Sequence, residues 1–129
     1  MLELAIAFAV SGFALEKTPQ ADFDHQAACH QFRTAAAADH VQPGRVINKT
    51  TKHGGVSVDC ETRSVEVRTL ISRNVRRSWL KAQERNWRDD VCSDPVINTA
   101  VGNGWKMTQT IVVRGKVAAV FQAECGHGS

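Results

Sequence analysis

The chain contains no Cys-X-X-Cys pair, no tyrosine and no glycine-rich phosphate-binding loop. Zinc ribbons and thioredoxin-like sites need two closely spaced cysteines, so the sequence favours neither class. It also lacks a serine nucleophile on a strand-to-helix elbow and a carboxylate pair at catalytic spacing. These absences favour a binding protein over an enzyme without deciding between them, and we expect no metal and no cofactor.

Length and composition indicate one small globular domain. The chain has 129 residues, of which 43% are hydrophobic and 22% charged, and these values exclude a multidomain enzyme, a collagen-like repeat and a fully disordered chain. Sixteen Lys and Arg residues against 13 Asp and Glu residues give a net charge of +3. That charge is far below the density of a nucleic-acid coat protein, and tyrosine is missing as a stacking residue, so nucleic acid is a disfavoured partner.

An apolar stretch at residues 2–15 has the length of the hydrophobic region of a secretory signal, and is shorter than the roughly 20 residues of a membrane span. Residues 12–14 (Gly-Phe-Ala) place small side chains at the positions that signal peptidase reads, although no basic segment precedes the stretch. We expect a signal peptide at residues 1–14, a single mature domain at 15–129 without a transmembrane span, and export to the periplasm or the extracellular space.

The four cysteines lie at near-equal intervals, at Cys29, Cys60, Cys92 and Cys125. An even number of cysteines in a short exported chain indicates two disulfides. Three connectivities are open, and we favour Cys29 with Cys60 and Cys92 with Cys125, because each pair then joins a helix to a strand of the sheet segment that follows it. The alternative is an intracellular protein whose cysteines bind a metal ion.

The hydrophobic pattern predicts an α+β fold with the element order α-βββ-αα-ββ. Helical spacing of apolar residues predicts helices at 21–39, 73–91 and 95–101, with Ser72 and Asp94 as N-caps of the last two. Alternating β-branched residues predict strands at 45–51, 56–60, 64–70, 105–113 and 116–125, with turns at 53–55, 61–63 and 114–115. We expect an antiparallel sheet of about five strands, helices packed on one of its faces, and a frayed tail at 126–129.

A basic face on the second predicted helix is the sharpest chemical feature of the sequence. Its outward positions are Arg73, Arg76, Arg77, Lys81, Arg85 and Arg88, with Glu84 as the one acid among them. Such a face attracts phosphates, anionic headgroups or an acidic protein surface, and its alternative is an ordinary solvated helix face. Trp105, beside a Gly-Asn-Gly turn, is either an exposed binding anchor or the first core residue of its strand.

These features predict an exported, non-catalytic binding module of an envelope process, such as an inhibitor, an immunity-type protein or a secretion-accessory protein. Its basic helix face or the open face of its sheet would bind an unknown protein or an anionic envelope component. The alternative is a small secreted hydrolase of the ribonuclease type, in which His25, His30, His53 and Lys52 come together around a phosphodiester. The sequence does not predict the oligomeric state.

Overall fold

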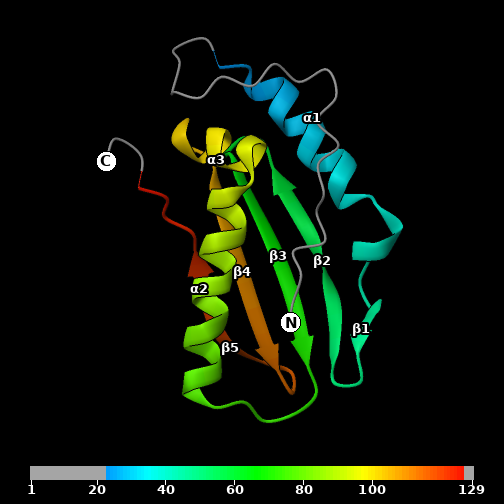
Figure 1. Cartoon of the computed structure of the whole chain (residues 1–129). Helices are drawn as coiled ribbons and strands as arrows, with labels where there is room; N and C mark the ends of the chain where they lie inside the picture. Colours follow the sequence, from blue (N-terminus) through cyan, green and yellow to red (C-terminus); the bar gives the residue numbers. More distant parts are fainter. Residues whose placement is uncertain (1–22, 127–129) are drawn as a thin grey trace.

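The computed structural model describes residues 23–126, and these form an α+β fold in the predicted element order (Figure 1). The helices are α1 (His25–Ala36), α2 (Arg77–Ser93) and α3 (Pro95–Gly102), with a short 3-10 turn, η1 (Asp39–Val41), after α1. The strands are β1 (Val46–Asn48), β2 (Thr51–Asp59), β3 (Ser64–Ile71), β4 (Lys106–Val113) and β5 (Lys116–Gln122). The expected signal peptide at 1–14 and most of the expected frayed tail lie outside the described residues.

The five strands form one sheet in the order β1-β2-β3-β4-β5. Its strand pairs are antiparallel, as predicted, with the exception of the parallel pair of β3 and β4. The parallel pair follows from the connection: α2 and α3 carry the chain back to the starting end of β3, so β4 runs in the same direction. The sequence shows apolar and polar residues alternating within each strand, but this alternation is the same for parallel and antiparallel neighbours and so does not predict the direction of β4.

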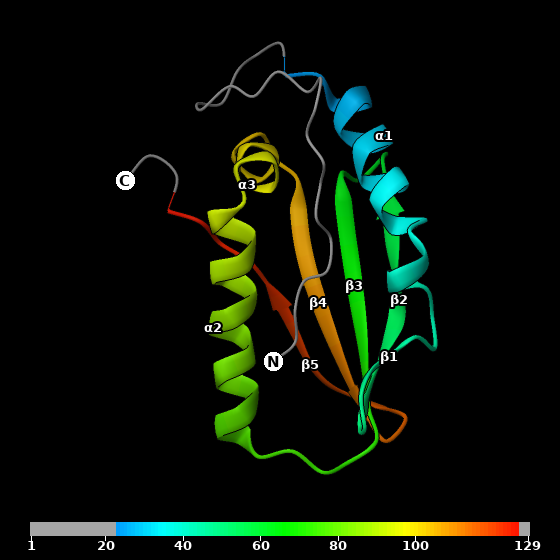
Figure 2. The same ribbon diagram turned by 45° about the vertical axis from the view of Figure 1, so that its right-hand side comes forward.

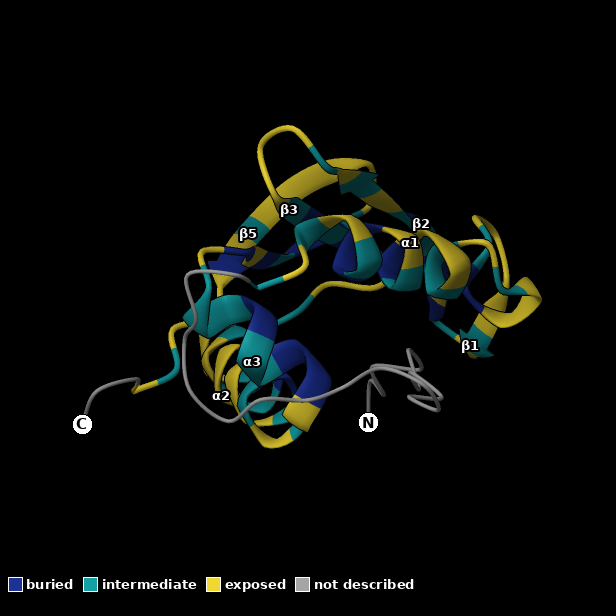
Figure 3. Cartoon of the chain, turned by 90° about the horizontal axis from the view of Figure 1, so that it is seen from above, coloured by how far each residue is buried: buried dark blue, intermediate teal, exposed yellow. Residues whose placement is uncertain are grey.

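All three helices lie on the same face of the sheet, as predicted (Figures 2 and 3). The core lies between the two layers and draws on every helix and on β3, β4 and β5. Its large buried members are Phe32, Val65, Val67, Ile71, Trp87, Val91, Ile97, Trp105, Met107, Ile111 and Phe121. Among the described helices, none combines the length and the hydrophobicity that a membrane span requires.

Side-chain caps fix the starts of two helices. Asp24 accepts a hydrogen bond from the amide of Ala27 and begins α1, while Asp94 accepts from the amides of Val96 and Ile97 and begins α3, as predicted. The predicted cap of α2 is wrong: the amide of Ser72 donates to the carbonyl of Thr50, so the chain stays extended and α2 begins only at Arg77. Residues 73–76 therefore form a loop rather than the first turn of a helix.

The turn expected at 53–55 is wrong as well, because β2 runs through these residues. His53 donates to the carbonyl of Arg45 and accepts from the amide of Gly44, and the pairing with β3 shifts by one residue after it. The two glycines thus accommodate a bulge. The turn into β2 lies earlier, at residues 49–50.

Two disulfides connect the helices to the sheet, in the pairing that the sequence favoured. Cys29 of α1 is bonded to Cys60 at the end of β2, with Cα atoms 5.7 Å apart. Cys92 of α2 is bonded to Cys125 after β5, with Cα atoms 5.5 Å apart. Each bond joins a helix to the segment that directly follows a strand of the sheet.

Candidate binding surface

Four strands end in one row at the lower edge of the sheet in Figure 1. Thr51 pairs with Ile71, Ile71 with Val113, and Val113 with Lys116, so the row crosses β2, β3, β4 and β5. The β1–β2 turn, the β3–α2 loop and the β4–β5 hairpin therefore meet at this edge. Two backbone hydrogen bonds connect the three loops. The amide of Ser72 donates to the carbonyl of Thr50, and the amide of Arg114 donates to the carbonyl of Ile71.

These three loops gather basic side chains, which we call the basic end. It consists of Lys49, Lys52, Arg73, Arg76, Arg77, Arg114 and Lys116, all of them exposed. The segments 45–52, 71–83 and 113–123 that carry them contain no Asp or Glu. Positive charge is therefore concentrated at one end of a chain whose net charge is only +3.

One contact with α2 and one contact between two loops position two of these arginines. The Arg73 guanidinium lies over the ring of Trp79, 5.2 Å from its centroid, and Arg114 donates a 3.3 Å hydrogen bond to Oδ1 of Asn74. Trp79 is half-buried against the core. A guanidinium that lies over an aromatic ring keeps its positive charge, but its side chain samples fewer rotamers. Arg73 is therefore pre-oriented at this surface.

The basic residues predicted on α2 divide into two groups. Arg77, Lys81, Arg85 and Arg88 are exposed along the helix, as expected from their spacing. Arg73 and Arg76 precede the helix and belong to the loop. Lys49, Arg114 and Lys116 were not predicted as binding residues, and Lys52 was predicted only for the hydrolase alternative. Their signal was their place in or directly beside turns at one end of neighbouring strands.

Acidic side chains gather at the opposite end of the molecule, where the β2–β3 turn, the start of α1, the end of α2 and the segment after β5 lie (Figure 1). They are Asp24, Asp59, Glu61, Asp89, Asp90, Asp94 and Glu124. Exposed Arg63 and Lys106 lie at the same end, so acids predominate there without being alone, whereas the segments of the basic end contain no acid.

The residues of the hydrolase hypothesis do not form one cluster. His25 begins α1 beside Arg63 of the β2–β3 turn, whereas His53 lies toward the other end of β2, about 20 Å along the strand at 3.3 Å per residue. His30 is exposed on α1, and Lys52 and His53, as neighbours in a strand, face opposite sides of the sheet. Residues 23–126 also hold no group of three or more His, Cys, Asp or Glu side chains arranged to bind a metal ion.

Trp105 belongs to the core and not to an exposed binding surface. Its side chain is 2% exposed, its ring centroid lies 4.9 Å from that of Phe32, and its Nε1 donates to Nδ1 of His25. Of the two alternatives for Trp105, the structure shows the core residue.

The open face of the sheet carries a paired polar group at its centre. The Glu66 carboxylate accepts a hydrogen bond from Oγ1 of Thr110 at 2.5 Å and one from Nη1 of Arg68 at 3.4 Å. Val120 on β5 is 60% exposed on the edge strand. The polar groups at the centre of this face are therefore already hydrogen-bonded to one another, whereas most charges of the basic end are exposed.

No protein-family model and no curated protein matches this sequence. The structure is similar to the crystal structure of a Pseudomonas aeruginosa protein that is described as secreted, with a TM-score of 0.62. The similarity covers 83% of this chain and 97% of that chain, at 16% sequence identity. The two proteins share a fold. The two disulfides of this chain are consistent with export, because such bonds persist in oxidising compartments.

Proposed function

We propose that the protein is an exported, non-catalytic binding module whose basic end binds the phosphate-bearing, anionic lipid surface of the cell envelope. The gathering of seven exposed basic side chains from three loops, with no acid in those segments, is the observation that carries this proposal. Anionic headgroups attract Lys and Arg near a membrane surface by about 1 kcal/mol per residue.

Exposed apolar side chains beside the basic end support a lipid surface over an acidic protein. Val46, which is 68% exposed, pairs in register with Lys52, and Val117, which is 58% exposed, follows Lys116. Peripheral proteins combine electrostatic attraction with apolar side chains that enter the headgroup region. The basic end offers both, so it fits a surface that is anionic and apolar at once.

Vesicle sedimentation tests this function with charge-matched variants. The triple variant Arg73→Glu, Arg76→Glu and Lys116→Glu reverses three of the seven charges of the basic end. The triple variant Arg85→Glu, Arg88→Glu and Lys106→Glu makes the same change of net charge away from the basic end. The first variant should bind phosphatidylglycerol vesicles at least about a hundredfold more weakly than the wild type, since three contacts of about 1 kcal/mol are lost and the new carboxylates repel the anionic headgroups. The second should bind within about threefold of the wild type, because charges outside the contact act only through the screened field.

Vesicles of phosphatidylcholine are the control for headgroup charge, and circular dichroism establishes that both variants fold. Equal weakening of binding in the two variants would show that net charge alone determines vesicle binding, and it would contradict a defined basic end. Absence of wild-type binding to phosphatidylglycerol would contradict a lipid surface and favour an acidic protein as the partner.

A further inference from the structure

The outer edge of β2 is covered only along its first half. β1 pairs with β2 at Lys52 and Thr51, and the chain at 44–45 bonds to His53. Pro43 lies against Gly55, since a Cβ built there would approach Cγ of Pro43 to 3.0 Å. Among the described residues no strand pairs with the outer edge of β2 from Val56 to Asp59.

The register of the sheet shows which backbone groups face this open edge. His53 directs its N–H and C=O outward and lies opposite Thr69, and Val56 lies opposite Val67, two residues along β3. Val56 therefore repeats the phase of His53, and Val58 repeats it again. Their N–H and C=O groups point away from β3, where an added extended chain can pair with them.

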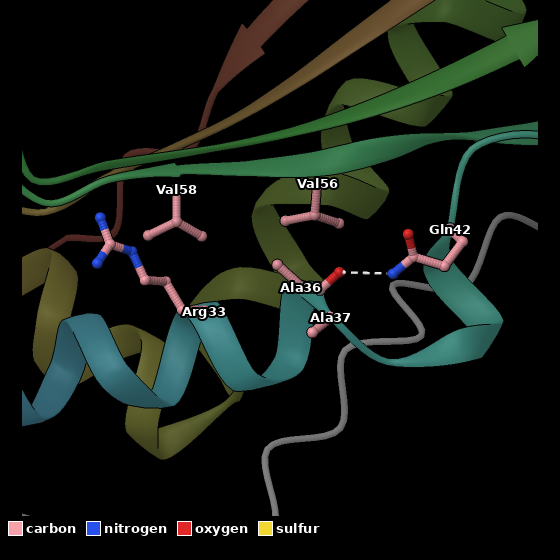
Figure 4. A pocket seen from close by; sticks show the side chains of 6 residues that line it. All are labelled: Arg33, Ala36, Ala37, Gln42, Val56 and Val58. Atoms are coloured by element: carbon pink, nitrogen blue, oxygen red, sulfur yellow. Dashed lines mark hydrogen bonds between the residues drawn. The ribbon is translucent and has the colours of Figure 1, made fainter.

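A groove of about 520 Å³ lies between this edge and α1, and Figure 4 shows its lining. Val56 and Val58 point from β2 toward α1, and Ala36 and Ala37 face them from the end of the helix. Gln42 bounds one side and donates hydrogen bonds of 3.1 Å to the carbonyls of residues 36 and 38, so its amide is held in place. Four of its six lining residues are apolar, so this shallow, open groove offers an apolar patch beside the polar groups of Gln42 and Arg33.

Among the described residues that line the groove, Arg33 is the charged one, and it lies on the side of Val58 (Figure 4). Its side chain is exposed and takes part in none of the ion pairs and side-chain hydrogen bonds of residues 23–126. A guanidinium beside an open strand edge is complementary to a carboxylate on the chain that pairs there.

We propose that the open edge of β2 and this groove form a docking site for an extended peptide segment of a partner protein. The segment adds a strand to the sheet beside Val56 and Val58, places an apolar side chain in the groove, and places an Asp or Glu side chain against Arg33. Side chains on one face of a strand recur every second residue, so the apolar and acidic residues of the ligand lie two positions apart.

A phage-displayed library of random heptapeptides, selected on the disulfide-bonded protein, tests this site. The wild type should enrich peptides that carry an apolar and an acidic residue at positions i and i+2. Arg33→Glu should enrich a basic residue in place of the acid, while Arg85→Glu, an exposed arginine on α2, should keep the wild-type preference. A synthetic copy of the best peptide should shift the amide signals of residues 56–59 in NMR spectra.

Three results would overturn the proposal: no enrichment above background, selected peptides that bind Arg33→Glu as tightly as the wild type, or amide shifts that lie away from residues 56–59. Loss of binding when only the C-terminal carboxylate of the peptide is amidated would also contradict the acidic side chain. Arg33 lies outside the basic end, so failure at this groove leaves the vesicle experiment unaffected.

Discussion

Nε1 of Trp105 donates a hydrogen bond of 3.0 Å to Nδ1 of His25, eighty residues earlier in the sequence. The bond connects the start of α1 to the residue before β4 at the acidic end of the domain. Nδ1 accepts this hydrogen only in the neutral imidazole. Burial first, and the positive charge of Arg63 second, lower the pKa of His25 below its ordinary value of 6.5, against an opposing effect of Asp24.

Acid is therefore expected to weaken the fold through His25. Its pKa is lower in the folded chain than in the unfolded chain, so its contribution to stability is complete above about pH 6.5 and is lost as the pH falls toward the folded pKa. Urea unfolding midpoints measured from about pH 7.5 to about pH 5 should fall for the wild type and fall less for His25→Phe.

His53 needs its own control in that experiment, because burial and then the charge of His40 lower its pKa in the same direction. Its Nδ1 is buried, and no group of residues 23–126 forms a hydrogen bond with it. The variant His53→Phe should remove a separate part of the acid sensitivity. A pH profile that His25→Phe leaves unchanged would show that protonation of His25 is not coupled to unfolding.

The two disulfides should contribute almost equally to stability. Their sequence separations are 31 and 33 residues, and the chain-entropy model assigns about 3–4 kcal/mol to each loop of this size. The double variants Cys29→Ala with Cys60→Ala and Cys92→Ala with Cys125→Ala should lower the free energy of unfolding by that amount, as measured in urea. A loss below about 1 kcal/mol in either would contradict the constraint that the model assigns to it.

The cap of α3 gives a local prediction. Asp94 Oδ1 accepts hydrogen bonds of 2.9 Å from the amide of Val96 and 3.1 Å from that of Ile97, and Pro95 occupies the first turn. Asp94→Ala should reduce the free energy of unfolding by about 1 kcal/mol, whereas Asp94→Asn keeps an acceptor and should lose only a few tenths. Equal losses in the two variants would mean that charge, rather than hydrogen bonding, is what Asp94 supplies.

Much of this fold is readable from local pattern. The strand alternation at Val65 and Val67, the proline and acid that begin α3, and the even number of cysteines indicate the element order, one helix cap and two disulfides. The disulfide pairing was a preference among three connectivities, and the structure confirms it. Such features depend on neighbouring residues or on simple connectivity. The sequence therefore predicts them without knowledge of the tertiary structure.

The errors arose where tertiary contacts override local preference. Serine is a common residue type at helix N-caps, yet the amide of Ser72 donates a hydrogen bond to the carbonyl of Thr50 in another loop. Two consecutive glycines after His53 resemble a turn, yet pairing with β3 and with residues 44–45 holds them in a bulged strand. In both cases a partner distant in sequence supplies the hydrogen bonds that decide the backbone.

The binding surface was predictable only in part for a related reason. The arginines of α2 recur at helical spacing and were visible as a face, whereas Lys49 lies in the β1–β2 turn and Arg114 and Lys116 lie in the β4–β5 hairpin, far from it in the sequence. They meet only because four strands end in one row, a consequence of the parallel pair of β3 and β4. The order and direction of strands must be known before such a cluster is visible.

The location of the membrane contact tests the central claim most directly. Nanodiscs that contain phosphatidylglycerol should be added to the ¹⁵N-labelled, disulfide-bonded protein while the amide signals are followed by NMR. The signals of residues 49–52, 72–77 and 114–116 are predicted to lose intensity first, because these loops form the basic end. Intensity loss centred on residues 59–63 and 89–94 at the acidic end, or no loss at all, would contradict the proposed function.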